Sequence, residues 1–460
     1  MGRLFGTDGV RGIANKDLTN ELALSIGKAA AKVLAGELGR KPTVLIGKDT
    51  RASGDMLEAA LTAGLCAVGA NVLSVGVVPT PAVAYLIGRY GCDAGVMISA
   101  SHNPCEYNGI KIFQSTGYKL DDAIEEEIEA IILDGAEEIP EKLGGDVGNR
   151  LYCKTAVEDY VRHVVDTADV RFDGLNIALD CANGSASSVA KPVFGSASVC
   201  AKQIFTALGA RCYMLSDTPD GVNINDHCGS THPEELMQFV TDNGLDLGLA
   251  FDGDADRMLA VDENGQLVDG DKVIAICAKR MLDEGTLAKK TAVVTVMSNM
   301  GFFKFCEENG IACEKTAVGD RYVLERMLQK GYNIGGEQSG HVIFLDYATT
   351  GDGELSGVQL LKTVVKSGKK LSQLAKIMTV YPQVLINVQV TPEGKQKYNN
   401  DEYIISAVQQ AEMDLMGDGR VLVRVSGTEP LVRVMLEGKD LEKITRLGNR
   451  IADVVRERLS

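Results

Sequence analysis

The chain of 460 residues is too long for one hydrophobic core and predicts three or four domains. It is 45% hydrophobic and 24% charged, which is typical of a soluble globular protein, and no apolar run is long enough to span a membrane. A net charge of −16 argues against nucleic acid as a partner, because binding nucleic acid phosphates needs a basic surface.

The cysteines favour a reducing compartment. There are 11 of them, an odd number, and they are scattered without a Cys-x-x-Cys pair, which excludes a paired disulfide framework and a simple zinc or redox motif. The first residues contain no apolar segment of the kind that directs secretion. We therefore expect a cytoplasmic protein that has no contact with membranes.

Predicted strands and helices alternate in the first third of the chain. The hydrophobic pattern predicts helices at 21–38, 56–68 and 82–89, and strands at 43–46, 72–77 and 94–98. An acidic run at 121–129 is typical of a solvated helix face. This order of strand, polar loop and helix predicts an α/β domain.

The same order occurs twice more along the chain. Strands are predicted at 175–179, 211–215, 291–296 and 311–316, and helices at 234–243 and 322–329. In each copy two glycines four residues apart precede a polar loop: Gly91 and Gly95, Gly244 and Gly248, and Gly331 and Gly335. Three matching spacings predict three homologous α/β domains, each with one functional loop at the same strand end.

The last part of the chain has a different pattern. Strands at 384–390, 420–425 and 431–436 and helices at 402–413 and 439–458 predict a smaller α+β domain. Linkers are predicted at 139–149 and 367–372. The fold class expected is three tandem homologous α/β domains with mixed sheets, plus the C-terminal α+β domain, around a central cleft. The four domains expected are 1–150, 151–253, 254–368 and 369–460.

The first functional loop, ISASHNP at 98–104, follows a short apolar strand. It offers two hydroxyls, an imidazole and an amide, and Lys111 follows it, which suits phosphoryl chemistry. The same residues also make ordinary turns. Ser99 and Ser101 would lie on the same side of an extended backbone, so the residues alone do not choose between them.

The second loop contains Asp252, Asp254 and Asp256 at alternate positions, which places their carboxylates on one side of an extended backbone. Such a cluster repels itself unless a cation lies within it, and all-oxygen ligands favour Mg²⁺ or Mn²⁺. An EF-hand is excluded because Arg257 stands where its sharp turn needs Gly and the flanks are predicted strands, although Glu263 fits its last position. A solvated acidic loop remains the alternative.

The third loop, GEQSGH at 336–341, places Glu337 and Ser339 between glycines. A carboxylate and a hydroxyl beside backbone that a ligand can approach closely suit the hydroxyls of a sugar. Glu337 could equally be a surface charge, and His341 a core histidine.

The fourth loop, RVSGTEP at 424–430, lies between two predicted strands, with Arg433 on the second. Arg424 and Arg433 can bind a phosphate through paired N–H groups, and the Ser-Gly-Thr turn can fill its other acceptor positions. A tight polar hairpin is the alternative.

Together, the segments ISASHNPCEYNGIKIF (98–113), FDGDADR (251–257), GEQSGH (336–341) and RVSGTEP (424–430) resemble the signature loops of the α-D-phosphohexomutases, in the same order over the whole chain. Within this superfamily, the opening RLFGTDGVRG and the segment AVGDRYV at 317–323 are most similar to the bacterial phosphoglucosamine mutases. Lys48 stands where many relatives have Arg, which keeps the charge but loses a fork of donors.

The resemblance implies a role for each loop. Ser101 would carry the phosphate as phosphoserine, and Asp252, Asp254 and Asp256 would hold one Mg²⁺ together with it. Glu337 and Ser339 would bind the sugar, and the non-reacting phosphate would be held by Arg424, Ser426, Gly427, Thr428 and Arg433. Further active-site positions are matched by Arg11, Lys48, His102, Lys111, Arg257 and His341.

The implied activity is that of an isomerase that interconverts glucosamine 6-phosphate and glucosamine 1-phosphate through a sugar 1,6-bisphosphate, for amino-sugar nucleotide and cell-wall precursor synthesis. A phosphorylated hexosamine is the expected substrate, and the chain is expected to be a monomer or homodimer. The alternatives are a phosphomannomutase/phosphoglucomutase and an inactive sugar-phosphate sensor. A hydrolase using Ser101 and His102 is disfavoured, because adjacent residues of an extended stretch point to opposite sides and no Gly-x-Ser-x-Gly elbow is present.

Overall fold

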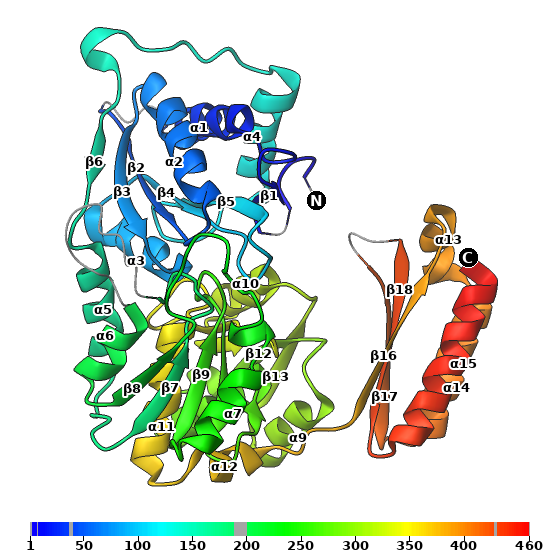
Figure 1. The fold of residues 1–460 in the computed structure, drawn as a ribbon. Helices are drawn as coiled ribbons and strands as arrows, with labels where there is room; N and C mark the ends of the chain where they lie inside the picture. Colours follow the sequence, from blue (N-terminus) through cyan, green and yellow to red (C-terminus); the bar gives the residue numbers. More distant parts are fainter. Residues whose placement is uncertain (1, 7, 36–39, 188–199, 427–429, 460) are drawn as a thin grey trace. The chain divides into compact units, whose positions relative to one another are not determined.

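The computed structural model describes residues 2–6, 8–35, 40–187, 200–426 and 430–459 (Figure 1). The chain forms two compact units, one of Met1–Met297 with Ile311–Ile377 and one of Ser298–Gly310 with Met378–Ser460. Among the described residues, no helix is both long enough and apolar enough to cross a membrane.

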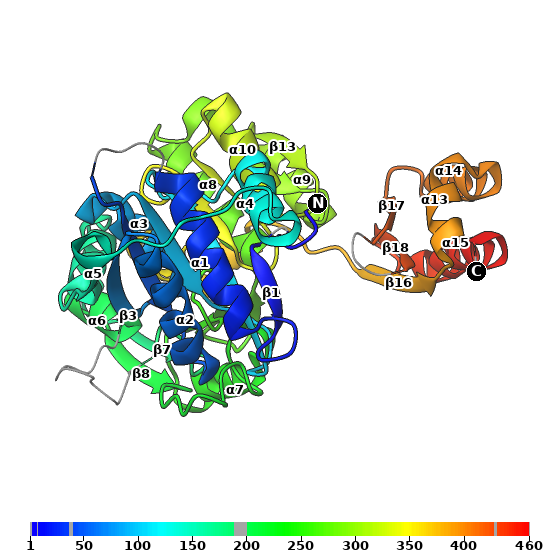
Figure 2. The ribbon, with the colours of Figure 1, turned by 90° about the horizontal axis from the view of Figure 1, so that it is seen from above.

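The first sheet of the larger unit is mixed, with strand order β1-β5-β4-β2-β3-β6. Its strands are β1 (Val10–Ile13), β2 (Thr43–Lys48), β3 (Asn71–Val77), β4 (Ala94–Ile98), β5 (Tyr107–Gln114) and β6 (Arg150–Tyr152). On one face lie α1 (Asn20–Ala35), α2 (Ser53–Ala67) and α4 (Asp122–Asp134), which Figure 2 shows side by side, and α3 (Thr80–Tyr90) packs on β2 and β4. Strands β2, β3 and β4 are parallel, and β5 is antiparallel to β4.

The second and third sheets repeat this arrangement. The second, of order β11-β10-β9-β7-β8, contains β7 (Asn176–Asp180), β8 (Arg211–Leu215), β9 (Leu247–Phe251), β10 (Met258–Asp262) and β11 (Leu267–Val268). The third, of order β13-β12-β14-β15, contains β12 (Thr291–Thr295), β13 (Ala312–Thr316), β14 (Ile334–Gly336) and β15 (Val342–Phe344). In every copy three parallel strands are followed by an antiparallel one, β5, β10 or β15. The predicted three α/β repeats with mixed sheets are confirmed.

The paired glycines explain why the repeats share a spacing. The first of each pair, Gly91, Gly244 or Gly331, has a positive φ of 62°, 59° or 68° and turns the chain after a helix. The second lies on the following strand, where a Cβ would collide with a side chain of that helix. In the second copy, for example, a Cβ on Gly248 would lie 2.8 Å from Val240 of α7 (Glu234–Asp242). The helix therefore packs closely on its strand and fixes where the next loop emerges.

The remaining helices of the larger unit surround the second and third sheets. They are α5 (Ala156–Asp166), α6 (Cys200–Ala207), α8 (Gly270–Asp283), α10 (Asp320–Lys330), α11 (Gly353–Ser367) and α12 (Leu371–Leu374). The sequence pattern did not predict α8 and α11. In α11 every residue from Gly353 to Val364 is buried, polar residues such as Glu354 and Gln359 included, so its polar positions do not mark a solvent-exposed face.

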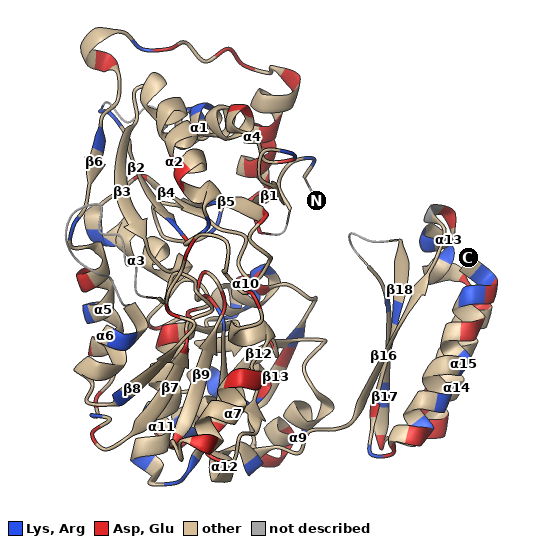
Figure 3. Ribbon diagram, in the orientation of Figure 1, with Lys and Arg blue, Asp and Glu red and all other residues tan. Residues whose placement is uncertain are grey.

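The acidic run of α4 is mostly a solvated helix face, as predicted, and is coloured red in Figure 3. Glu129 is the exception, because it is only 2% exposed. Its carboxylate accepts hydrogen bonds from the backbone N–H groups of Arg3, Leu4 and Phe5. This residue therefore anchors the start of the chain to the first domain.

The smaller unit contains the predicted α+β domain together with residues 298–310, which the sequence placed in the expected domain 254–368. Its antiparallel sheet has the order β16-β18-β17, with β16 (Gln383–Gln389), β17 (Gly419–Val425) and β18 (Leu431–Gly438). Its helices are α9 (Met300–Asn309), α13 (Pro392–Lys397), α14 (Glu402–Leu415) and α15 (Leu441–Leu459). The buried carboxylate of Glu437 accepts hydrogen bonds from Met300 N and from Arg420, which ties α9 to this sheet.

The boundaries of the four expected domains remain predictions. The second sheet continues through β10 and β11 to Val268, so the expected boundary at 253 and 254 falls within the β9–β10 connection.

Candidate active site

The loop after β4 brings Ser101 to the three aspartates. Ser101 is 1% exposed, and its Oγ donates a hydrogen bond of 2.6 Å to Asp252 Oδ2. The Ser99 hydroxyl instead makes its hydrogen bonds within the first domain. It donates to Asp49 Oδ2 at 2.6 Å and accepts from Ser101 N at 2.9 Å. The structure thus distinguishes two serines that the residues alone did not.

The backbone at Ser101 differs from the prediction. It is not extended, because Ser101 has a φ of 53°, in the left-handed region that residues other than Gly rarely adopt. As a result, Ser101 Oγ and His102 Nδ1 lie 3.4 Å apart instead of on opposite sides. The prediction that the Ser101 and His102 side chains point to opposite sides is therefore wrong.

A Ser–His pair is nevertheless disfavoured by the hydrogen bonds. Arg257 Nη1 lies 3.2 Å from His102 Nδ1, and a guanidinium can only donate, so Nδ1 is the acceptor. Burial and the charges of Arg257 and Arg11 lower the pKa of His102 to about 4. The ring is therefore neutral at pH 7, and its one Nδ1 lone pair faces Arg257 while the Ser101 hydroxyl donates to Asp252.

The aspartate cluster lies on the turn between β9 and β10. One oxygen from each of Asp252, Asp254 and Asp256 lies within 4.8 Å of the others, and all three residues are buried. The predicted convergence is confirmed, but the backbone is a tight turn, with Ala255 at φ 55° and its N–H bonded to Asp252 O. Antiparallel strands flank the cluster, in agreement with the exclusion of an EF-hand.

The donor set of this cluster fits a hard divalent cation. Burial and the charges of Asp256 and Asp254 raise the pKa of Asp252 well above its usual range. Among the described residues, neither Asp254 Oδ1 nor Asp256 Oδ1 has a hydrogen-bond partner, although both atoms are buried. Three convergent carboxylates with unsatisfied oxygens favour Mg²⁺ over the softer transition metals.

Lys111 brings positive charge to this cluster from β5. Its Nζ lies 2.8 Å from Asp254, 3.1 Å from Asp8 and 3.6 Å from Asp256. Burial alone lowers the pKa of Lys111, but the charges of Asp254 and Asp8 outweigh it and raise the pKa above its usual value. Arg11 also pairs with Asp8. The ammonium of Lys111 is therefore a permanent charge at the site.

The residues predicted to bind the sugar lie in the loop between β14 and β15. Glu337 Oε1 accepts a hydrogen bond of 3.2 Å from Gly319 N, and Ser339 is exposed. His341 is buried, and its Nε2 accepts a hydrogen bond of 3.1 Å from Gly351 N. The ring proton is therefore on Nδ1, which lies 3.7 Å from Asp256 Oδ2.

The predicted phosphate loop belongs to the smaller unit. Arg424 and Arg433 lie directly opposite each other on β17 and β18. Burial and the charge of Arg433 lower the pKa of Arg424. Two cations at opposed positions repel each other, and an anion between them would relieve this repulsion. Ser426 N donates to Leu431 O at 2.8 Å, whereas Gly427 and Thr428 lie outside the described residues.

Comparison with known families accounts for this set of loops. Family models described as phosphoglucomutase/phosphomannomutase match the chain in order: alpha/beta/alpha domain I at 2–138, domain II at 158–265, domain III at 269–381 and the C-terminal domain at 385–454. The chain belongs to the phosphoglucomutase/phosphomannomutase family. The resemblance inferred from the four loops is therefore confirmed.

Within the phosphoglucomutase/phosphomannomutase family, similar curated proteins share more than half of the residues. A protein named phosphoglucosamine mutase from Ruminiclostridium cellulolyticum is 55% identical over 460 residues, with 100% of both chains covered. Another of that name, from Acetivibrio thermocellus, is 54% identical over 459 residues, again with 100% of both chains covered.

Solved structures share the fold of this family member. A family protein from Burkholderia thailandensis has a TM-score of 0.80 at 24% identity, covering 99% of this chain and 98% of its own. The N-acetylphosphoglucosamine mutase of Aspergillus fumigatus has a TM-score of 0.68 at 16% identity, with 99% and 96% covered. At these identities the comparison supports the fold alone.

Sequence reasoning missed one residue that holds the Ser101 loop, Arg51, and one that contacts the aspartate turn, Thr80. Arg51 donates to the backbone carbonyls of Ser101, Asn103 and Pro104. Thr80 Oγ1 donates to Asp254 Oδ2 at 2.7 Å. The signal in the sequence was weak, because Arg51 follows β2 and Thr80 follows β3, and neither residue belongs to one of the four motifs.

Lys48, which the sequence placed in the active site, has other partners. Its Nζ pairs with Asp55 and, at 2.5 Å, with Glu58, both on α2. Glu58 also accepts from Ser74 and Arg150. The predicted contact of Lys48 with phosphate stays a prediction.

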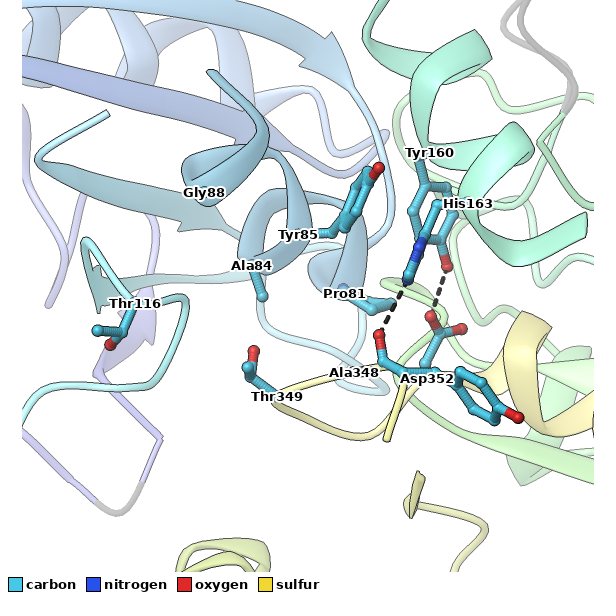
Figure 4. Close-up of a pocket in the computed structure, with 11 residues that line it drawn as sticks. Pro81, Ala84, Tyr85, Gly88, Thr116, Tyr160, His163, Ala348, Thr349 and Asp352 are labelled. Atoms are coloured by element: carbon cyan, nitrogen blue, oxygen red, sulfur yellow. Dashed lines mark hydrogen bonds between the residues drawn. The ribbon is translucent and has the colours of Figure 1, made fainter. Parts of the chain in front are cut away.

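A separate cavity of about 160 Å³ lies where α3, α5 and the segment before α11 approach one another (Figure 4). The rings of Tyr85 and His163 stack there at 3.9 Å, and Tyr160 donates to Asp352 at 2.8 Å. None of the predicted site residues lines this cavity. It is distinct from the cluster around Ser101.

Proposed function

We propose that this chain interconverts glucosamine 6-phosphate and glucosamine 1-phosphate. The observation that carries the proposal is the contact between the Ser101 hydroxyl and the buried aspartate cluster, at 2.6 Å from Asp252. A hydroxyl in that place can carry a phosphoryl group next to a cation. The relatives named phosphoglucosamine mutase support the choice of sugar.

In this proposal Ser101 is present as phosphoserine. The bond from Ser101 Oγ to phosphorus breaks as the free hydroxyl of the sugar monophosphate bonds to phosphorus. The proton of that hydroxyl passes, in net, to Ser101 Oγ, which leaves a serine hydroxyl and a sugar 1,6-bisphosphate. The bisphosphate reorients in the site and transfers its other phosphate to Ser101. Because transfer needs mainly position and charge stabilisation, the geometry around Ser101 matters more than any one acid or base.

Positive charge around the phosphoryl group would come from a bound cation and from two side chains of this chain. We assign Asp252, Asp254 and Asp256 as the ligands of one Mg²⁺, together with the phosphoserine. The bound ion would supply positive charge that offsets the phosphate. Lys111 adds a second permanent cation, and Arg257 a third beside His102.

The remaining assignments extend to sugar and phosphate recognition. Glu337 and Ser339 would bind sugar hydroxyls, with His341 beside the cluster and Arg11 next to Asp8. The non-reacting phosphate is assigned to Arg424, Ser426, Gly427, Thr428 and Arg433. A cytoplasmic enzyme of amino-sugar nucleotide and cell-wall precursor synthesis, as a monomer or homodimer of four-domain chains, fits these assignments.

The test is a substrate panel. Purified protein with Mg²⁺ and a trace of glucose 1,6-bisphosphate is given glucosamine 6-phosphate, glucose 6-phosphate or mannose 6-phosphate, and the 1-phosphates are measured by ³¹P NMR. We expect glucosamine 6-phosphate to give the highest kcat/KM. Faster conversion of mannose or glucose phosphate would favour a phosphomannomutase/phosphoglucomutase, and binding without any conversion would favour a sugar-phosphate sensor.

A further inference from the structure

The guanidinium of Arg51 is almost entirely occupied by the backbone of the phosphoserine loop. Its Nη2 donates to Ser101 O at 2.9 Å and to Asn103 O at 2.8 Å, and its Nη1 donates to Pro104 O at 2.5 Å. Arg51 lies just after β2 and is 3% exposed. A planar fork of donors can hold several carbonyls at fixed angles, which a lysine cannot do.

The fork itself is fixed by a neighbouring carboxylate. Asp49 Oδ2 accepts from Arg51 Nε at 2.9 Å, and Asp49 Oδ1 accepts from Arg51 N at 3.0 Å. Both side chains are fully buried. Asp49 Oδ2 also accepts from the Ser99 hydroxyl, so the same carboxylate orients both Arg51 and the residue before Ala100.

A second domain contacts the same carbonyls. Asn225, which follows β8, donates from Nδ2 to Ser101 O at 2.9 Å and to Asn103 O at 3.1 Å. Its own φ is 58°, a conformation that Asn tolerates better than most residues. Ser101 O and Asn103 O thus each accept hydrogen bonds from two separate repeats of the fold.

The aspartate turn comes close to the same carbonyl. A Cβ on Gly253, between Asp252 and Asp254, would lie 2.6 Å from Ser101 O and 2.9 Å from Asn225 Nδ2. Only glycine therefore allows this approach, and the position of the Ser101 carbonyl sets the distance between the loop of Ser101 and the aspartate turn. Ser101 must also keep its unusual positive φ.

We propose that Arg51 and Asn225 are positioning residues which hold the Ser101 carbonyl from two sides, and so keep Ser101 Oγ aligned with the aspartate cluster for phosphoryl transfer. This inference rests on the proposed function. Neither side chain is assigned a contact with the sugar. Their loss should therefore slow transfer and leave substrate binding and metal binding nearly unchanged.

The test compares Arg51→Lys and Asn225→Gly with the wild-type chain. Lysine keeps the charge beside Asp49 but loses the fork, and glycine removes the amide while tolerating the positive φ. Arg171→Lys is the matched control, since Arg171 makes a similar two-bond contact with Asp173 on the exposed surface.

Two rates are measured in each variant. The first is the rate at which glucose 1,6-bisphosphate phosphorylates Ser101, followed by intact mass, and the second is single-turnover transfer from phosphoserine to glucosamine 6-phosphate. We expect both to fall by about 10- to 100-fold in Arg51→Lys and Asn225→Gly, because small displacements of a reacting atom cost rates of that order. KM and the Mg²⁺ dissociation constant should change by less than about threefold.

The double variant adds a further criterion. Because both residues hold one carbonyl, Arg51→Lys with Asn225→Gly should lose less than the product of the two single losses. Wild-type rates of phosphorylation and transfer in the folded single variants would overturn the inference, as would losses confined to KM. The proposed sugar can fail separately, since phosphorylation by glucose 1,6-bisphosphate does not depend on glucosamine phosphate being preferred.

Discussion

At the scale of single residues, Ser101 combines a strained backbone with a hydroxyl directed at a carboxylate. A serine in the left-handed region costs about 1 kcal/mol relative to an extended one, and it persists only where the surroundings determine it. Here the surroundings are hydrogen bonds from Arg51 and Asn225 to its carbonyl and from its own N–H to Ser99. Strain held in this way is typical of a functional position.

The first prediction concerns Ser101 itself. Ser101→Ala removes the phosphate acceptor, so turnover of glucosamine 6-phosphate should be lost, while the substrate Kd should stay within about tenfold, or roughly 1.4 kcal/mol. Kinetics measure the turnover, calorimetric titration measures the Kd, and intact mass checks that no phosphate is carried. Ser25→Ala on α1 is the control. Retained turnover in Ser101→Ala would contradict the assignment of the phosphoserine.

A second residue-scale prediction concerns the buried carboxylates at the start of α11. Burial, followed by the charge of Asp352, raises the pKa of Glu354 to about 8, and burial raises that of Asp352 to about 6. In the unfolded chain both lose their protons near pH 4. Between the unfolded and folded pKa values the native state holds more protons, so stability falls as pH rises through this range.

Glu354→Gln should remove much of this pH dependence. Its free energy of unfolding should exceed that of the wild type by an amount that grows by about 1.4 kcal/mol per pH unit between roughly pH 5 and 8, and then levels off. Urea unfolding at pH 6, 7 and 8 measures the difference. The amide can still accept from Cys200. A difference independent of pH would show that Glu354 is ionised in the folded protein.

At the scale of elements, the sequence predicted the strands and helices that have a clear hydrophobic pattern. Strand 94–98 matched β4 and strand 211–215 matched β8, because each is a short and mainly apolar run that ends at a serine, Ser99 or Ser216. Helices α8 and α11 were missed because tertiary packing buries most of their surface. The aspartates were found by spacing, whereas Arg51 and Asn225 were not, since their function depends on contacts between loops distant in sequence.

An element-scale prediction follows from the crossing of α1 and α2. A Cβ on Gly27 would lie 2.7 Å from Leu61 O, and a Cβ on Gly64 would collide with Leu24 O, so the two helices touch through backbone. Gly64→Ala should force them apart and lower the free energy of unfolding by about 1–3 kcal/mol. Activity per folded molecule should remain, because neither helix carries a predicted site residue.

The matched control for this crossing is Gly88→Ala in α3. Within the described part of the chain, nothing lies within 4 Å of a Cβ at Gly88. Alanine there should be neutral or stabilise the helix by up to about 1 kcal/mol. Thermal unfolding of both variants measures the contrast, and equal effects of the two substitutions would contradict the backbone contact at Gly64.

At the scale of the whole molecule, an acidic chain must bind an anionic substrate. The net charge of −16 disfavours any phosphate approaching at random, so cations have to be concentrated where phosphate is bound. In the larger unit, Lys111 and Arg257 pair with residues of the aspartate cluster, where we propose that phosphate is bound. In the smaller unit, Arg424 and Arg433 are opposed across β17 and β18.

A substitution of Arg424, which lies opposite Arg433, can distinguish a role in phosphate binding from a role in stability. Like charges at opposed positions of a sheet are unfavourable, so Arg424→Met should leave the thermal stability unchanged or slightly increased. If the pair binds the non-reacting phosphate, the same substitution should raise KM for glucosamine 6-phosphate by about 10- to 100-fold, the loss expected for a bidentate phosphate contact.

Arg446→Met, the same change on exposed α15, should alter neither quantity. Differential scanning fluorimetry and steady-state kinetics measure both. A lower Tm with an unchanged KM would mean that Arg424 supports the sheet of the smaller unit instead of holding phosphate.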